Sequence, residues 1–527
     1  MAQSQAPQVR LALTISGAVA LGAYEGGALG ALLVAVQELC RDGGPPPIRV
    51  DAMGGASAGS ITAMLAARAL LAGLDPVYVM YQAWVKRDSL GNMRTHDAHA
   101  PLSVDAIRDM AVDLLDPKDP DATGRPVQPS DIRVDMALAC LRGLTYNVAR
   151  LHGTPIEVTT YLDWATFTFT TKQTAEDFLK PDNASPLEFA LASGANELGF
   201  PPRVLNRKVR EEDKQALKEI ELVDPPKDWP GWLWYTDGGT IDNEPLGRTF
   251  DVANQVDDAD GGEYRRLHLL VHPHPTANPK GQEWMDPDHQ PPWTTTLIRG
   301  DHIQRTQNLF SDLRNAEKAN SRIEWADRLA AAVTPLLEAD QSGAWRDALA
   351  GVVAEIQGQK EAIRAKKPDA ADAPAAPPAS GSGEELFRQV VGLVSGLTGK
   401  QQADVHVVSP LILEEAKGKP VEELLAGEFL GHFGGFLDEK LRISDFALGY
   451  RSMQTWLEKY LPDYLPADQA TPAIKAAGDG YKKDWDNYHF GDETLGSLPL
   501  RDKLDMARLA VHMGRVALGE VIFRHRP

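Results

Sequence analysis

Residues 49–60 have the sequence RVDAMGGASAGS, and the five residues Gly55-Ala-Ser57-Ala-Gly59 within this stretch form a GxSxG pattern. A short apolar run at 48–53 precedes the pattern and an Ala/Leu-rich run at 61–74 follows it, so a strand is expected to turn sharply into a helix at this point. That context is typical of a nucleophile elbow, in which small residues on both sides of the serine let the turn close. We therefore interpret Ser57 as a candidate nucleophile, with the positive end of the helix directed at developing negative charge.

The same order of elements occurs once before Ser57. A buried strand is expected at 9–15, a glycine-containing loop at 16–22 and a helix at 23–40, and two strand-loop-helix units in succession indicate parallel strands covered by helices. The sequence thus predicts an α/β layered core. The other elements that it predicts are helices at 76–116, 186–195, 294–366, 420–461 and 499–520, and strands at 132–140, 156–171 (two short ones), 267–271 and 405–413.

The chain of 527 residues is long enough for several domains. Residues 367–384, which include PDAADAPAAPPASGSG, are rich in Ala, Pro, Ser and Gly and are interpreted as a flexible linker. We therefore expect an α/β core with helical insertions at 1–366 and a mostly helical C-terminal region at 385–527. If the strand at 405–413 joins the sheet that begins at residue 9, the C-terminal region completes the same core.

Composition excludes several classes of function. The formal net charge of −20 argues against binding to nucleic acid and against electrostatic adsorption to an anionic membrane, so any membrane contact would have to be transient and apolar. The only two cysteines, Cys40 and Cys140, exclude a disulfide framework and a four-cysteine zinc site.

The N-terminus resembles a signal peptide, because Arg10 is followed by the apolar stretch LALTISGAVALGAY. The apolar run nevertheless continues past Glu25, as it would in a strand, a loop and a core helix. We find no uninterrupted stretch as long as a membrane span and predict a soluble, cytoplasmic protein, with a periplasmic or secreted location as the alternative.

A serine hydroxyl is a weak nucleophile and needs a base within hydrogen-bond reach. The best candidate is Asp237 in the stretch YTDGGTIDNEPL at 235–246, where an aromatic run at 229–235 precedes it and Gly238 and Gly239 follow it. Asp-Gly-Gly is also a turn signal by itself. The aromatic run either packs in the core, lines an acyl pocket or touches a lipid interface, and the sequence does not sort its residues among these three roles.

An early glycine-containing loop, a GxSxG pattern and a DGGxxxNxP pattern, in that order, resemble the signature of patatin-like phospholipases over residues 9–275. The segments 191–202 and 433–450 are also similar to regions of that family. The resemblance implies a three-layer α/β/α core with a central, mostly parallel sheet, helical insertions and a mostly helical C-terminal region. It further implies a lipid or other acyl ester as the substrate, a catalytic dyad of Ser57 and Asp237 without histidine, and no cofactor or metal.

The resemblance also implies an oxyanion hole formed by backbone N–H groups of the loop from Gly17 through Ala18 to Val19, with Ala58 as a further donor. This chain departs from the family here, because it has Gly17-Ala-Val-Ala-Leu-Gly22 where family members have three glycines, any residue, a basic residue and glycine. Ala and Val do not share the access of glycine to positive φ, so we expect a reshaped or lost hole. Leu21 replaces the basic residue, and Glu197 stands where the family usually has proline.

Four alternatives remain open. Ser57, Asp237 and His272 occur in the chain order of an α/β-hydrolase triad. The altered loop also fits a catalytically inactive protein that binds lipids or acts as a scaffold. A metal site of His272, His274, Asp286, Asp288 and His289 has no supporting spacing, and Gly54–Gly59 resembles a phosphate-binding loop that lacks its lysine. The sequence leaves acyl-chain length, head-group preference, oligomeric state and any activating partner open.

Overall fold

The computed structural model describes most of the chain. The described residues are 8–87, 89–95, 100–148, 156–180, 184–197, 199–207, 221–225, 229–260, 264–275, 293–339, 342–365, 381–395, 402, 404–428, 432–487, 503–504, 506–508 and 511–512.

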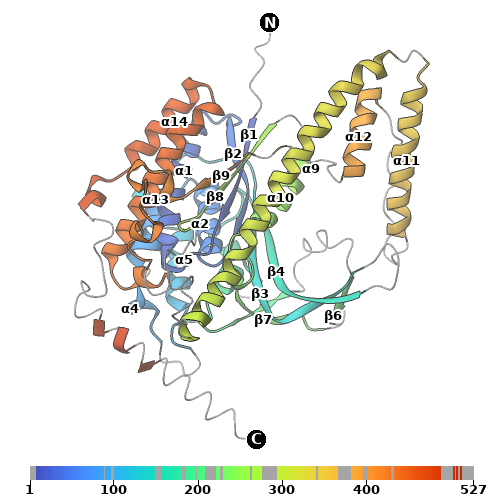
Figure 1. Ribbon diagram of the computed structural model, residues 1–527. Coiled ribbons are helices and arrows are strands. Elements are labelled where there is room, and N and C mark those ends of the chain that lie inside the picture. The colour runs from blue at the N-terminus through green and yellow to red at the C-terminus, as the bar shows by residue number, and fades with distance from the viewer. Residues whose placement is uncertain are drawn as a thin grey trace, which may run out of the picture. The chain divides into compact units, whose positions relative to one another are not determined.

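One mixed sheet forms the centre of the fold (Figure 1). Its strand order is β5-β7-β3-β2-β1-β8-β9, and β4 and β6 also pair with β3. The pairs β1–β2, β1–β8 and β2–β3 are parallel, whereas β4, β6 and β7 run antiparallel to β3. The strands are β1 (Gln8–Ile15), β2 (Ile48–Gly55), β3 (Ile132–Val148), β4 (Ile156–Phe169), β5 (Arg203–Asn206), β6 (Glu221–Asp224), β7 (Trp232–Asp237), β8 (Tyr264–Val271) and β9 (Asp404–Val408).

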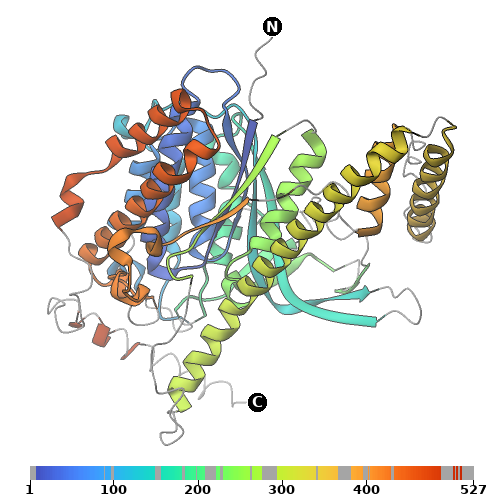
Figure 2. The same ribbon diagram turned by 45° about the horizontal axis from the view of Figure 1, so that its top comes forward.

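Helices cover both faces of this sheet. The described part of the chain as a whole, including helices that do not lie on the sheet, contains α1 (Gly22–Leu39), α2 (Ala58–Ala72), α3 (Pro76–Tyr81), α4 (Leu90–Met93), α5 (Asp105–Leu115), α6 (Ala175–Phe178), α7 (Pro186–Ser193), α9 (Leu246–Asp260), α10 (Trp293–Glu338), α11 (Ala344–Ala365), α12 (Gly383–Ser395), α13 (Glu439–Tyr460) and α14 (Ala467–Gly480). On one face, α1 contacts α2 as well as α13 and α14 (Figure 2). On the other, Val252 and Ala253 of α9 pack against Ala12 of β1 and Ala52 of β2. The expected three-layer α/β/α core is therefore confirmed.

Glycine allows α1 and α13 to approach closely. A Cβ added at Gly27 of α1 would lie 1.9 Å from the carbonyl oxygen of Phe446, and one added at Gly449 of α13 would lie 1.9 Å from that of Tyr24. Any larger residue at either position would force the two helix backbones apart. The C-terminal helix α13 is thus part of the main hydrophobic core, which contains Phe446, Tyr450 and Trp456.

One strand differs from the sequence-based expectation, and another decides between the two readings of the C-terminal region. Residues 156–169 form one strand of 14 residues and not two short ones, because β4 pairs along nearly the whole length of the 17-residue strand β3. β9 neighbours β8, so the strand near residue 405 does join the sheet that begins with β1. The C-terminal region consequently completes the same core, which is the alternative that the sequence left open for the strand at 405–413.

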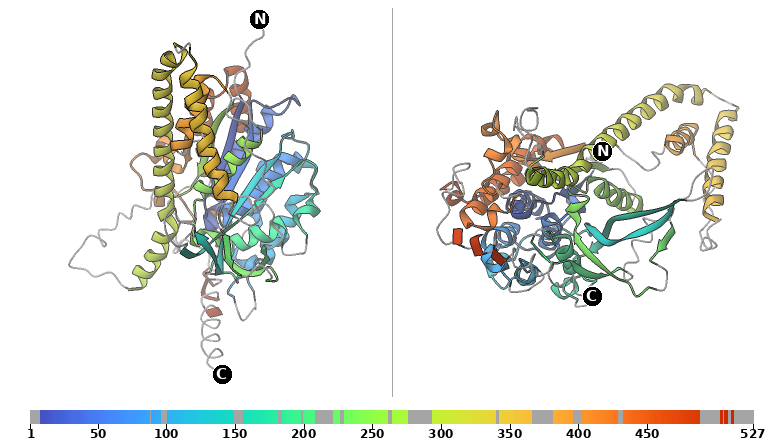
Figure 3. Two further views of the ribbon diagram at one scale, coloured as in Figure 1. Left: turned by 90° about the vertical axis from the view of Figure 1, so that its right-hand side faces the viewer. Right: turned by 60° about the horizontal axis from the view of Figure 1, so that its bottom comes forward.

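The division into domains differs from the one expected. The chain forms two compact units, the first from 1–256, 261–309 and 405–527 and the second from 257–260 and 310–404. Helices after residue 310, which we had assigned to the core, belong to the second unit. Within that unit α12 packs on α11, and its Arg388 pairs with Asp327 of α10 (Figure 3). Residues 367–380 of the expected linker lie outside the described residues, and α12 begins at Gly383, inside the range predicted as linker.

The helical stretch Val19–Leu39 is long and apolar enough to span a membrane, judged by length and composition alone. This corrects our expectation that no stretch reaches that length. In the fold, 89% of its most apolar window is buried. It therefore serves as a core helix, as the strand-loop-helix interpretation required.

Candidate active site

Ser57 lies at the sharp turn between β2 and α2. Its φ of 52° and ψ of −123° put a non-glycine residue in a strained backbone region, as a nucleophile elbow requires. The glycines beside it have no room for a side chain: a Cβ at Gly55 would lie 2.5 Å from Gly59 C, and one at Gly59 would lie 2.3 Å from Ile15 O. The two small residues of the GxSxG pattern therefore let the turn close against β1.

Asp237 ends β7 and faces Ser57. The Ser57 hydroxyl donates a hydrogen bond of 2.9 Å to Asp237 Oδ2, although the two residues are 180 positions apart in the chain. Both side chains are buried, with exposed fractions of 5% for Ser57 and 1% for Asp237. The structure thus brings together the two residues that the sequence singled out.

Two further donors hold the Asp237 carboxylate. The backbone N–H of Gly239 donates to its Oδ1 at 2.8 Å, and Asn196 Nδ2 donates to its Oδ2 at 3.3 Å. Gly238 is needed for a different reason, since a Cβ there would lie 2.1 Å from the carbonyl oxygen of Ala137. The glycines after the aspartate therefore combine one hydrogen bond with one close approach of backbones.

Sequence reasoning missed a set of supporting polar residues. Ser193 Oγ accepts from the backbone N–H of Ser57 at 3.0 Å and lies 2.8 Å from Ser60 Oγ, which in turn donates to Gly55 O. Ser193 and Asn196 both belong to the segment 191–202 that resembles the family. That likeness was the available signal, although it assigned no role to either residue.

The loop from Gly17 to Gly22 passes beside the serine. A Cβ at Gly17 would lie 3.2 Å from Ser57 Cβ. Gly17 itself is tied to Asn243, because its N–H donates to Asn243 O at 2.8 Å and its carbonyl accepts from Asn243 Nδ2 at 3.0 Å. Its N–H is therefore engaged by Asn243, which differs from the expectation that it serves as an oxyanion donor.

Val19 corrects a second expectation about this loop. Although a branched side chain disfavours positive φ, Val19 has a φ of 50°. Among the described residues, no hydrogen-bond acceptor is found for the N–H groups of Ala18, Val19 or Ala58. The loop beside Ser57 therefore keeps N–H groups without an acceptor, and its backbone is strained at Val19.

The other departures from the family pattern have simple structural roles. Leu21, which stands in the position of the basic residue, is buried in the main core. Glu197 accepts a hydrogen bond of 3.2 Å from the Thr240 hydroxyl, just after the Asp237 turn. Neither replacement contacts Ser57 directly among the contacts described.

Glu25 is the most unusual titratable group near this loop. It belongs to the first turn of α1 and is fully buried, and it accepts a hydrogen bond of 3.0 Å from Ser16 Oγ, directly before Gly17. Desolvation by burial raises the pKa of its carboxyl group well above the usual 4.5, against a smaller lowering by the Ser16 bond. Burial beside this loop therefore favours the protonated, uncharged form of the Glu25 carboxyl group.

His272 has other partners than the serine and the aspartate. Its Nε2 lies 3.1 Å from Glu244 Oε1, and its Nδ1 accepts from the backbone N–H of His274 at 3.1 Å. Both imidazole nitrogens are thereby engaged away from the Ser57–Asp237 pair. Of the hypothetical metal ligands, Asp286, Asp288 and His289 lie outside the described residues, and no metal-ligating cluster occurs within the described part of the chain.

Comparison with known proteins agrees with this geometry. Residues 13–249 match the family model of the patatin-like phospholipase. The chain contains a patatin-like phospholipase domain. Among solved structures the chain is similar to VipD from Legionella pneumophila at 12% identity over 94% of each chain, with a TM-score of 0.17, a likeness too weak to carry an argument. No curated protein matches the chain.

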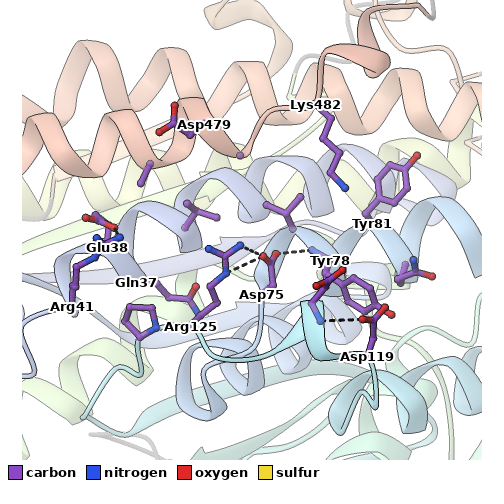
Figure 4. A pocket seen from close by; sticks show the side chains of 17 residues that line it. Gln37, Glu38, Arg41, Asp75, Tyr78, Tyr81, Asp119, Arg125, Asp479 and Lys482 are labelled. Carbon is purple, nitrogen blue, oxygen red and sulfur yellow. Dashed lines mark hydrogen bonds and ion pairs between the residues drawn. The ribbon is translucent and has the colours of Figure 1, made fainter.

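A cavity lies far from Ser57, between residues of the matched region and residues near position 480. It has a volume of about 780 Å³ and is lined by side chains of both charges, including Arg41, Asp75, Arg125 and Lys482 (Figure 4). Asp75 follows the C-terminal end of α2, whereas Ser57 precedes its N-terminus, and a helix of 15 residues is about 22 Å long. The cavity is therefore separate from the Ser57–Asp237 pair.

Proposed function

We propose that this protein is a lipid acyl hydrolase that cleaves carboxylic esters through an acyl-serine intermediate at Ser57. The hydrogen bond of 2.9 Å from Ser57 Oγ to Asp237 Oδ2 carries the proposal, because it couples a nucleophile to a base without any intervening group. The patatin-like domain supports it at a general level, since its family comprises lipid esterases.

In the first half-reaction Ser57 Oγ attacks the ester carbonyl carbon while its proton passes to Asp237. The tetrahedral oxyanion accepts hydrogen bonds from the N–H groups of Ala18, Val19 and Ala58, and the positive end of α2 adds to its stabilisation. Collapse of the intermediate breaks the ester bond, and the leaving alcohol takes the proton from Asp237. The acyl group remains on Ser57.

In the second half-reaction Asp237 takes a proton from water, and the resulting hydroxide attacks the acyl-serine carbonyl. Collapse releases the fatty acid and returns the proton to Ser57. Asn196 and Gly239 hold the carboxylate in place through both steps by donating to its two oxygens. His272 takes no part, because its two ring nitrogens are engaged by Glu244 and His274.

The test is hydrolysis of a soluble p-nitrophenyl ester and of phosphatidylcholine by the purified protein. We expect Ser57→Ala and Asp237→Asn each to lower turnover by about 10³-fold or more, a magnitude typical of losing a member of a catalytic serine centre. Ser452→Ala is the matched control, since Ser452 is a buried serine that bonds within α13. Turnover that persists in a well-folded Ser57→Ala variant would contradict the proposal.

A further inference from the structure

Four strands extend the sheet beyond the edge that holds Ser57. β2 ends at Gly55, which pairs with Met136, but β3 continues for a further twelve residues to Val148. This part of β3 pairs with β4, β6 and β7 (Figure 2). We call these strand segments, residues 140–148, 156–162, 221–224 and 232–235, the strand extension.

Large apolar side chains are exposed on the strand extension. On β7, Leu233 and Tyr235 are buried, whereas the alternating Trp232 and Trp234 are 46% and 55% exposed. On β3, Leu141 follows the buried Cys140, which pairs with Tyr235, and is 53% exposed. Further exposed apolar side chains on β4 and β6 are those of Val158, Tyr161 and Val223.

The exposed tryptophans continue a face that is covered elsewhere. Ala139 pairs with Thr236, so Asp135 and Ala139 of β3 share one face of the sheet with Thr236 and Trp234 of β7. Over the core, α9 covers this face, where its Arg248 pairs with Asp135. At Trp234 the same face is open, and apolar residues stand where an outward strand face normally carries polar ones.

We propose that the strand extension docks this protein on a lipid surface, with Trp232, Trp234 and Leu141 inserted at the interface. Tryptophan suits such a boundary because its ring is apolar and its N–H can remain hydrated. The exposed ion pair of the extension, Arg142 with Asp224, is neutral as a whole, and the chain carries a net charge of −20. The surface is therefore a zwitterionic one and not an anionic one.

The exposed face lies close to the candidate active site along β7. Trp234 precedes Asp237 by three residues on the same strand, which corresponds to about 10 Å. Asp237 points to the opposite face of β7 from Trp234, so docking through Trp234 brings the end of this strand close to the lipid and leaves the Ser57–Asp237 pair on the other face of the sheet. The inference rests on the proposed function for the choice of lipid as the occupant, since the substrate of that function resides in such a surface.

Flotation of the full-length protein with phosphatidylcholine vesicles tests the proposal. We expect the wild-type protein to float with the vesicles. The double variant Trp232→Ser/Trp234→Ser should bind the vesicles at least about tenfold more weakly, because two interfacial rings are lost. The matched control is Trp325→Ser/Trp345→Ser, which removes two exposed tryptophans, 67% and 61% exposed, from the second unit. Its binding should stay within about twofold of wild type. Circular dichroism and thermal melting confirm that both variants are folded.

Three outcomes of flotation would overturn the proposal. These are failure of wild-type protein to float, an equal loss in both double variants, and unchanged binding in Trp232→Ser/Trp234→Ser. Light scattering tests whether a second copy of the chain occupies this face instead. A wild-type dimer that becomes a monomer in Trp232→Ser/Trp234→Ser would assign the face to a second copy and overturn the proposal. Flotation involves no turnover, so a protein that binds vesicles through these tryptophans but hydrolyses no ester would refute the proposed function and leave this inference standing.

Discussion

Gly59 lies so close to Ile15 that a side chain at residue 59 would meet the carbonyl oxygen of Ile15 at 2.3 Å. This contact joins the turn after β2 to the end of β1, and the turn presents Ser57 to Asp237. The last glycine of the GxSxG pattern is therefore a requirement of backbone packing.

Gly59→Ala should destabilise the fold strongly, by more than about 2 kcal/mol, because the backbone of the first turn of α2 and that of the end of β1 must separate. Gly44→Ala is the matched control, since a Cβ at Gly44 meets nothing within 4 Å. Chemical denaturation of both variants measures the difference. Equal stability of the two variants would contradict the assigned contact.

Val19 carries backbone strain that glycine would remove. A β-branched residue with a φ of 50° is costly, so Val19→Gly should lose less than about 0.5 kcal/mol of stability despite its lost side chain, or should gain stability. Val34→Gly, which removes a partly buried valine from within α1, should lose more than about 1 kcal/mol. A loss at Val19 as large as the loss at Val34 would show that the loop is not strained in solution.

Glu25 should make the stability of the protein depend on pH. The raised pKa means that native protein keeps this proton above pH 4.5 while the unfolded chain releases it, so stability falls as pH rises from 4.5 toward the raised value. Glu25→Gln cannot ionise and can still accept from Ser16, so its melting temperature should fall less between pH 5 and pH 8. Burial lowers the pKa of His268 to about 3, so His268 makes the protein more stable as the pH rises toward 6.5. This contribution is the same in the wild type and in Glu25→Gln. Parallel melting profiles would mean that Glu25 is ionised in the folded state.

The sequence was sufficient to predict the parts of the fold and site that depend on short local patterns. The GxSxG and Asp-Gly-Gly patterns predicted Ser57 and Asp237, because a tight turn tolerates few residue types beside a reactive side chain. It was also sufficient for the early strand-loop-helix units, whose apolar runs have clear boundaries. The catalytic role of the two residues stays a prediction until activity is measured.

Other features depended on tertiary contacts that the sequence does not encode locally. Trp234 is exposed and Tyr235 is buried because they alternate between the two faces of β7, and the aromatic run alone could not show which of these faces is covered. Ser193 and Asn196 matter only because α7 places them beside the turns of Ser57 and Asp237. The positive φ of Val19 likewise contradicts its intrinsic preference, in a loop whose Gly17 and Ala20 N–H groups bond to Asn243 and His432.

Covalent labelling by a fluorophosphonate probe, with peptide mapping of the modified residue, tests the central claim most directly. The wild-type protein should be labelled at Ser57, and His272→Gln should be labelled at a rate within about tenfold of wild type, because His272 bonds to Glu244 and not to the serine. Asp237→Asn should be labelled about 10³-fold more slowly, since it cannot accept the serine proton. Labelling at Ser57 that requires Asp237 and survives loss of His272 is the result that the account predicts. Labelling that is lost in folded His272→Gln, or that is absent at Ser57 in the folded wild-type protein, would contradict it.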